Sequence, residues 1–204
     1  MVLWDRWCEL WGRLQAEGDP KVRYTDLAGL YTQPHRAYHT LKHVDACLTA
    51  FDAARHLCSH PNEVDYAIWF HDAIYDPRRL DNEAQSARLA QEVADAIKMS
   101  SGFGSRVADL ILATKHESLP TNPDAQWVVD VDLSGLGLSF EEFSRNGDLV
   151  RQEYDWLEET EFKKNQEALF RRFLGRPSVF CTEFFQSKHE QQARSNLERA
   201  LAMS

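Results

Sequence analysis

Apolar side chains recur at the spacing of an α-helix along almost the whole chain of 204 residues. In the first segment Leu3, Trp7, Leu10, Trp11 and Leu14 fall on one stripe, the pattern of a helix with one face turned to a core. Glycine (9) and proline (7) are scarce, which disfavours a turn-rich all-β fold. The sequence therefore predicts an all-α protein.

Glycine, proline and capping residues divide this pattern into separate helices. Pro61 suits the first turn of a helix, and Ser139 with Glu142 forms a capping box. Only the run Trp127–Val131 resembles a strand, and it is short and ambiguous. We expect residues 1–204 to form one helical domain. The expected helices cover about residues 3–14, 24–31, 39–57, 61–71, 82–99, 106–116, 139–158, 161–174 and 183–202.

The charge of the chain restricts its partners. With 32 acidic and 23 basic residues its net charge is −9, which repels nucleic acid and anionic membranes at long range. We therefore expect neither as a partner. The early charges exclude a signal peptide or a membrane span at the N-terminus, so a cytoplasmic protein is expected. The four cysteines form no CxxC pair, which favours free thiols in a reducing compartment.

Three histidines lie in positions suited to chemistry. His39 and His43 are four residues apart, so on one helix both would point the same way. His71 and Asp72 are adjacent at the end of the next helix. His43 and His71 are in phase with apolar stripes, where a bare charge would be costly.

Two aspartates, Asp130 and Asp132, lie in the mostly apolar run VVDVDLSGLG. A carboxylate in such a run needs a cation, a metal ion or several N–H donors as its partner. Imidazoles and carboxylates that converge make a mixed nitrogen and oxygen site, which suits manganese, iron, cobalt, nickel or zinc. The residues alone leave open which aspartate takes part.

The motifs YHTLKHV, WFHDAIYD and DVDLSGLG, in this order in an all-α chain, resemble the HD superfamily. The segments DNEAQSA, ILATKH and FLGRPSVFCTEFF with EQQARSNL are similar to a bacterial subfamily described as predicted metal-dependent HD phosphohydrolases. The first motif also resembles the YHN…H signature of cyclic-nucleotide phosphodiesterases. The resemblance implies an HD-type helical bundle.

The resemblance assigns roles to individual residues. It implies that one divalent transition metal (manganese, zinc, iron, cobalt or nickel, with magnesium also compatible) is bound by the ligands of the H…HD…D pattern, His43, His71, Asp72 and Asp132. The DLS sequence favours Asp132 over Asp130. The phosphodiesterase signature makes His39 the proton donor, with a capping or supporting role as the alternative. The chain lacks the purine clamp of those enzymes, so cyclic-nucleotide hydrolysis does not carry over.

Other polar residues flank these motifs. Arg36, Lys42 and Lys115 are candidates to clamp a phosphate. Glu83 is a candidate to orient the attacking water or to support a ligand histidine, with a helix cap as the alternative. His116 is the candidate ligand for a second ion, although one ion is expected.

The expected function is metal-dependent hydrolysis of a phosphate ester, with a small phosphorylated substrate and a nucleotide as one option. One alternative is a module that senses metal and nucleotide without turnover. Another is a di-iron oxygenase of the HD type, which the small supply of additional ligands argues against. The sequence predicts neither the substrate nor the oligomeric state.

Overall fold

The computed structural model describes residues 3–203, which form one compact all-α domain without a strand. The all-α prediction is therefore confirmed. The elements in chain order are α1 (Leu3–Leu14), α2 (Pro20–Leu30), α3 (Leu41–Asp52), η1 (Arg55–Leu57), α4 (Pro61–Phe70), α5 (Asn82–Ala96), α6 (Phe103–Leu112), η2 (Ala113–Lys115), α7 (Pro123–Asp132), η3 (Leu133–Gly137), α8 (Phe140–Glu153), α9 (Glu159–Leu174) and α10 (Glu183–Met203).

Local capping chemistry sets several helix starts. Proline stands in the first turn of α2, α4 and α7, where its missing N–H costs nothing. The side chains of Asp19, Thr40 and Asn122 accept backbone N–H groups of α2, α3 and α7. The Ser139 hydroxyl accepts the backbone N–H of Glu142 at the start of α8, which confirms this half of the capping box. The Glu142 carboxylate accepts the Ser139 hydroxyl and not the Ser139 backbone N–H that the motif predicts.

The strand-like run Trp127–Val131 is helical, which corrects the sequence-based interpretation. It belongs to α7, whose residues are buried almost all round because α3, α4 and α6 pack against it. A short helix enclosed on all sides shows a continuous apolar run, and periodicity alone does not distinguish this from a buried strand.

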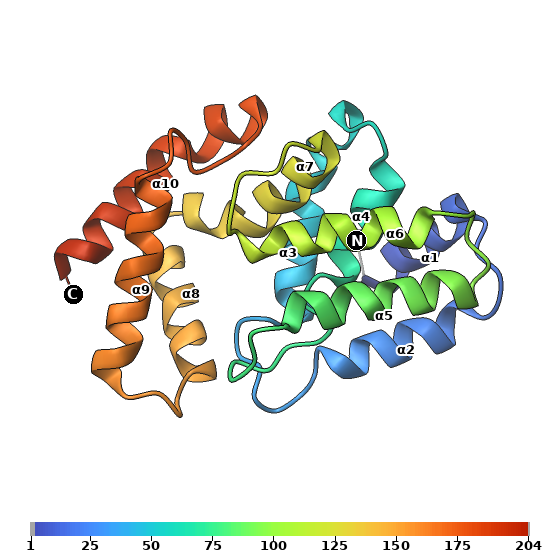
Figure 1. The fold of residues 1–204 in the computed structure, drawn as a ribbon, viewed down its shortest axis with the longest axis horizontal. Helices are drawn as coiled ribbons and strands as arrows, with labels where there is room; N and C mark the ends of the chain where they lie inside the picture. The colour runs from blue at the N-terminus through green and yellow to red at the C-terminus, as the bar shows by residue number, and fades with distance from the viewer. Residues whose placement is uncertain (1–2, 204) are drawn as a thin grey trace.

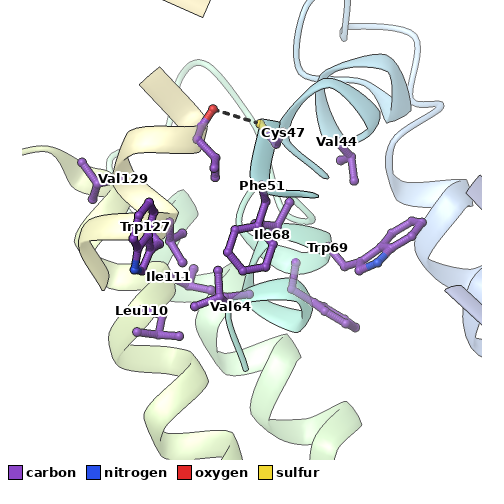
Figure 2. Close-up of a cluster of buried hydrophobic side chains, with 14 of the residues drawn as sticks. Val44, Cys47, Phe51, Val64, Ile68, Trp69, Leu110, Ile111, Trp127 and Val129 are labelled. Carbon is purple, nitrogen blue, oxygen red and sulfur yellow. Dashed lines mark hydrogen bonds between the residues drawn. The ribbon is translucent and has the colours of Figure 1, made fainter. Parts of the chain in front are cut away.

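The central helix of the core is α4, which packs against α1, α3, α5, α6 and α7. All of its residues from Glu63 to Phe70 are buried. Figure 2 shows Val64 and Ile68 of α4 against Phe51 of α3 and Ile111 of α6. This tight packing fixes the ends of α3, α4 and α7 relative to one another.

The last three helices lie at one end of the long axis, with α8 and α9 beside α10 (Figure 1). The side-chain amide of Asn196 on α10 donates to the carbonyls of Leu136 and Leu138. Glu190 accepts the backbone N–H groups of Val179 and Phe180. These bonds fasten α10 to the domain.

No helix among residues 3–203 is long and apolar enough to cross a membrane.

Asp130→Asn is predicted to destabilise the metal-free protein by about 2–3 kcal/mol. The buried Asp130 carboxylate accepts the backbone N–H groups of Cys181 (2.7 Å) and Thr182 (2.7 Å) and the Thr182 hydroxyl (2.6 Å). An amide presents only one acceptor to these donors. Urea denaturation measures the change in unfolding free energy. Asp109→Asn, at an exposed position of α6, is the matched control and is expected within about 0.5 kcal/mol of the wild type; equal losses in both variants contradict the assignment.

Candidate metal centre

Three helices bring their ligand side chains to one point. His43 lies in the first turn of α3, His71 follows the last residue of α4, and Asp132 ends α7. His43 and His71 are buried, with 6% and 2% of their surface exposed. Together with Cys47 these residues form a group whose donor atoms all lie within 4.8 Å of one another, so the group could hold a metal ion.

The distances between the donor atoms fit a shared cation. The Nε2 atoms of His43 and His71 are 3.1 Å apart, and Oδ1 of Asp132 lies 3.1 Å from the first and 3.5 Å from the second. Ligand bonds of about 2.1 Å place neighbouring donor atoms roughly 3 Å apart.

A hydrogen bond fixes the tautomer of His71, and this tautomer determines what can lie between the two histidines. Its Nδ1–H donates to the carbonyl of Ile68 at 2.8 Å, so a neutral His71 carries a lone pair on Nε2. That lone pair faces the Nε2 of His43 across 3.1 Å. Two nitrogen lone pairs at this distance repel unless a proton or a metal ion lies between them. A backbone carbonyl on the far nitrogen is also the usual support of a metal-binding histidine.

The carboxylates attract a positive charge to this point. Burial lowers the pKa of His71, but Asp72 and Asp132 outweigh it and raise that pKa well above the ordinary value. Oδ2 of Asp72 lies 3.0 Å from Nε2 of His71 and 3.6 Å from Nε2 of His43. The donor set of two imidazoles and two carboxylates therefore fits a divalent transition metal.

Cys47 is a member of the group that the sequence did not indicate as a ligand. Its Sγ lies 3.6 Å from Nε2 of His43, and its thiol points to the carbonyl of Val131, also at 3.6 Å (Figure 2). Burial, followed by the charges of Asp132 and Asp72, raises the pKa of the thiol well above its ordinary value. Thiolate is the form that binds metal, and a bound cation can deprotonate a thiol. The Cys47 thiol, however, already donates to the carbonyl of Val131, whereas the Asp72 carboxylate faces both histidines and needs no deprotonation, which favours Asp72 as the fourth ligand.

The two aspartates of the VVDVDLSGLG segment have separate surroundings. Asp132 faces the histidines, whereas Asp130 is fully buried and bound to Cys181 and Thr182. The second oxygen of Asp132 lies 2.9 Å from Nε2 of His116. His116 therefore lies at the edge of the group, and it adopts a left-handed backbone with φ of 54°.

Arg36 does not clamp phosphate, which corrects the sequence-based interpretation. It is buried, and its guanidinium donates to the carbonyls of His39, Asp72 and Ala73 at 2.9, 2.7 and 2.9 Å. Its Nε–H donates to the side-chain oxygen of Gln33 at 3.3 Å. Arg36 thus ties the segment before α3 to the end of α4.

His39 lies outside α3, which corrects the expectation of one helix from residue 39. Thr40 caps α3, and the carboxylate of Glu153 holds the preceding backbone. Oε1 of Glu153 accepts the N–H groups of Ala37, Tyr38 and His39 at 2.8, 2.8 and 2.9 Å. A buried carboxylate with three backbone donors fixes this segment in a bent form, and an additional helical turn would redirect those donors.

The same carboxylate orients the His39 ring. Oε2 of Glu153 lies 2.6 Å from Nδ1 of His39 and accepts the Tyr75 hydroxyl at 2.9 Å. The His39 and Tyr75 rings stack with centroids 4.2 Å apart. Burial lowers the pKa of His39, but Asp72 and Glu153 outweigh it and raise that pKa. Sequence reasoning missed Glu153, because it lies 114 residues from His39 without a recognisable motif.

The remaining predicted site residues lie around this centre. Lys42 is exposed on α3 next to His43, and Lys115 is partly buried next to His116. Glu83 lies in the first turn of α5, whose N-cap residue Asp81 makes no side-chain capping bond. Glu83 does not support His71, because the carbonyl of Ile68 already accepts the Nδ1–H of that ring. The roles of Lys42, Lys115 and Glu83 in catalysis stay predictions.

Cobalt binding distinguishes a ligand set that contains Asp72 from one that contains Cys47. One cobalt ion per chain is expected in the wild type and in Cys47→Ser, with no thiolate-to-cobalt charge-transfer band. His71→Ala and Asp132→Asn should lose the ion, and with it the rise in melting temperature that a bound metal gives. Absorption spectroscopy and metal analysis measure this. A charge-transfer band that disappears in Cys47→Ser would make Cys47 a ligand.

Glu153→Gln is predicted to remove a contribution to the unfolding free energy that is present at neutral pH and lost in acid. Burial raises the pKa of Glu153, but His39 and the backbone N–H donors outweigh it and lower the value from 4.5 to about 2. A depressed carboxyl pKa stabilises the fold above about 4.5, and this contribution is lost as the pH falls toward about 2.

The difference in unfolding free energy between wild type and Glu153→Gln should therefore shrink over this pH range, as urea denaturation of the metal-free protein measures. Glu141→Gln, on the exposed side of the same helix, is the control and should show no such trend. A difference that stays constant with pH speaks against the depressed pKa.

Comparison with known proteins gives no counterpart for this centre. No protein-family model matches the chain, and no curated protein or solved structure does so either. Membership of the HD superfamily, which the motifs indicate, is therefore a proposal.

Proposed function

We propose that the protein is a divalent-metal-dependent phosphohydrolase of the HD type that acts on a phosphate ester, with a nucleotide as one option. The observation that carries the proposal is the pair of buried Nε2 atoms of His43 and His71, 3.1 Å apart and flanked by carboxylates. A second observation supports hydrolysis in particular. A histidine with its own carboxylate partner, His39, lies beside this pair, with its ring centroid 5.8 Å from that of His43.

The four ligands His43, His71, Asp72 and Asp132 would hold the cation. A bound divalent cation supplies polarisation of a phosphoryl oxygen and a lowered pKa of water. The chain itself fixes the orientation of the ligands. Ile68 sets the tautomer of His71, and Arg36 holds the backbone carbonyl of Asp72.

His39 would hold and deliver a proton. Its Nδ1 is bound to Glu153, so the proton available to a substrate is on Nε2. Its raised pKa favours the protonated ring near neutral pH. The His39 side chain is 20% exposed, which leaves it open to a substrate from solvent. Its place in the reaction would be protonation of the leaving-group oxygen.

Three further residues would bind the phosphate or position the attacking water. Lys42 and Lys115 would balance the charge of the phosphate, and Glu83 would orient the attacking water. The substrate would be a small phosphorylated molecule in the cytoplasm. The high negative charge of the chain, −9, supports a small ligand held by local cations over nucleic acid or a membrane surface.

The purified protein is predicted to hydrolyse a phosphate ester only with a divalent metal, and a chelator should abolish the activity. His39→Ala should then lower the rate by roughly 10²–10⁴-fold while metal stays bound, because a proton donor acts in the transition state. Release of phosphate and metal analysis of the same samples measure both effects. Binding of metal and nucleotides without turnover would instead indicate a sensor, and oxygen consumption with two bound irons an oxygenase.

The leaving group provides a sharper check on His39. A nitrophenolate leaves with little protonation, whereas an alkoxide requires a proton. His39→Ala should therefore affect a nitrophenyl phosphate far less than an alkyl phosphate. Equal losses on both substrates would show that His39 positions the phosphate and does not act as the acid.

A further inference from the structure

A cavity of about 370 Å³ lies beside Tyr75 and Glu153, the two residues that hold the His39 ring. The proposed hydrolysis assigns no binding role to the residues that line this cavity. It lies between the segment before α3, the loop that follows Ile74 and the end of α8. His35, Tyr75, Arg78, Glu153 and Trp156 are among the residues that line it, and we call it the Trp156 pocket. Its size is in the range of sites that bind small organic ligands.

Trp156 and Arg78 form a wall of this pocket in which an exposed indole carries a cation on its face. The Trp156 side chain is large and apolar, yet 42% of the residue is exposed. The guanidinium carbon of Arg78 lies 5.5 Å from the centroid of its ring. An indole with a cation on its face, left open to solvent, is suited to a flat ring with a negative group attached.

The charge of Arg78 is not neutralised by a neighbour. Within residues 3–203 it forms no ion pair, whereas the adjacent Arg79 binds Asp81 through two contacts of 2.8 Å. The carboxylate of Asp76, close in sequence, instead accepts the backbone N–H of Arg78 at 3.0 Å. The Arg78 guanidinium is therefore free to bind an anion.

The buried acid of the pocket does not repel such an anion strongly. The Glu153 carboxylate accepts five hydrogen bonds, from three backbone N–H groups, His39 and Tyr75. These donors direct their positive ends at the carboxylate and so weaken its field in the pocket. Asp76, which also lines the pocket, accepts the backbone N–H of Arg78. Asp155, the other acid at the end of α8, is exposed, so solvent and salt screen it.

We propose that the Trp156 pocket binds an aromatic phosphate of the nucleotide class, with the ring on Trp156 and the phosphate on Arg78. Binding there requires no metal ion, so it is independent of the proposed hydrolysis. Tyr75 and Glu153 form walls of the pocket and also hold His39, which makes the pocket a neighbour of the reaction site. The ligand is either the organic part of the substrate or a separate effector.

Binding of adenosine 5′-monophosphate to the metal-free protein tests the proposal, with calorimetry in the presence of a chelator. Adenosine and inorganic phosphate are the separate halves of the probe. Trp156→Ala should weaken binding of the nucleotide roughly 5- to 150-fold, the range for loss of one base–aromatic stack. Trp156→Phe should retain part of the affinity, because a smaller ring still stacks.

Arg78→Gln should weaken the nucleotide roughly tenfold and affect adenosine much less, because the main loss is the phosphate contact and Trp156 remains for the ring. Arg145→Gln is the matched control, since Arg145 is an exposed arginine paired with Glu141 on α8 and lies outside the pocket lining. It should bind like the wild type. Both Trp156 and Arg78 are exposed, so circular dichroism should show folded variants.

Absence of nucleotide binding at millimolar concentration overturns the proposal, as does binding that Trp156→Ala and Arg78→Gln leave unchanged. Binding that needs added metal and disappears in His71→Ala also overturns it, because the nucleotide would then occupy the metal centre. Kinetics identify the source of the ligand once binding is shown. A raised KM with unchanged kcat in Arg78→Gln indicates the substrate, and loss of a nucleotide effect on the rate indicates an effector.

Discussion

The Nε2 atoms of His43 and His71 face each other at 3.1 Å inside the core. The packing of α3, α4 and α7 brings them and Asp132 together. The two nitrogens repel each other unless a proton or a metal ion lies between them, and a metal ion there brings a positive charge. Carboxylates of Asp72 and Asp132 supply the attraction for that charge. The tight core around α4 keeps the ligands from moving apart, because α4 packs against five other helices. The packed helices thus hold these polar groups close together more precisely than flexible loops would.

A second buried charge, Glu153, connects the end of α8 to the segment before α3. It ends α8, yet its five hydrogen bonds go to the segment before α3 and to Tyr75. Arg36 holds the same segment from the other side through the carbonyls of His39, Asp72 and Ala73. Two oppositely charged residues therefore fix a stretch of chain that has no secondary structure of its own. Removal of either would leave buried backbone groups without partners.

This support also forms the boundary between the metal centre and the Trp156 pocket. The Tyr75 ring stacks on His39, and both Tyr75 and Glu153 line the pocket. A ligand on Trp156 and Arg78 would contact the residues that orient His39 without touching the metal ligands. The two sites therefore share walls but not donors. This separation allows binding and chemistry to be varied independently by substitution.

The sequence by itself determined the helical class, most of the helix starts and the ordered set of metal-binding candidates, because periodicity, caps and motifs are local properties of the chain. It misjudged Trp127–Val131, since an enclosed helix loses its polar face. The DLS resemblance favoured Asp132 over Asp130, and the tertiary structure showed the separate surroundings of the two aspartates. Only the tertiary structure placed Cys47 beside His43 and moved His39 out of α3. It also revealed Glu153, 114 residues from its partner His39. These features depend on contacts between distant segments, and no local pattern encodes which buried donor a buried acceptor will meet.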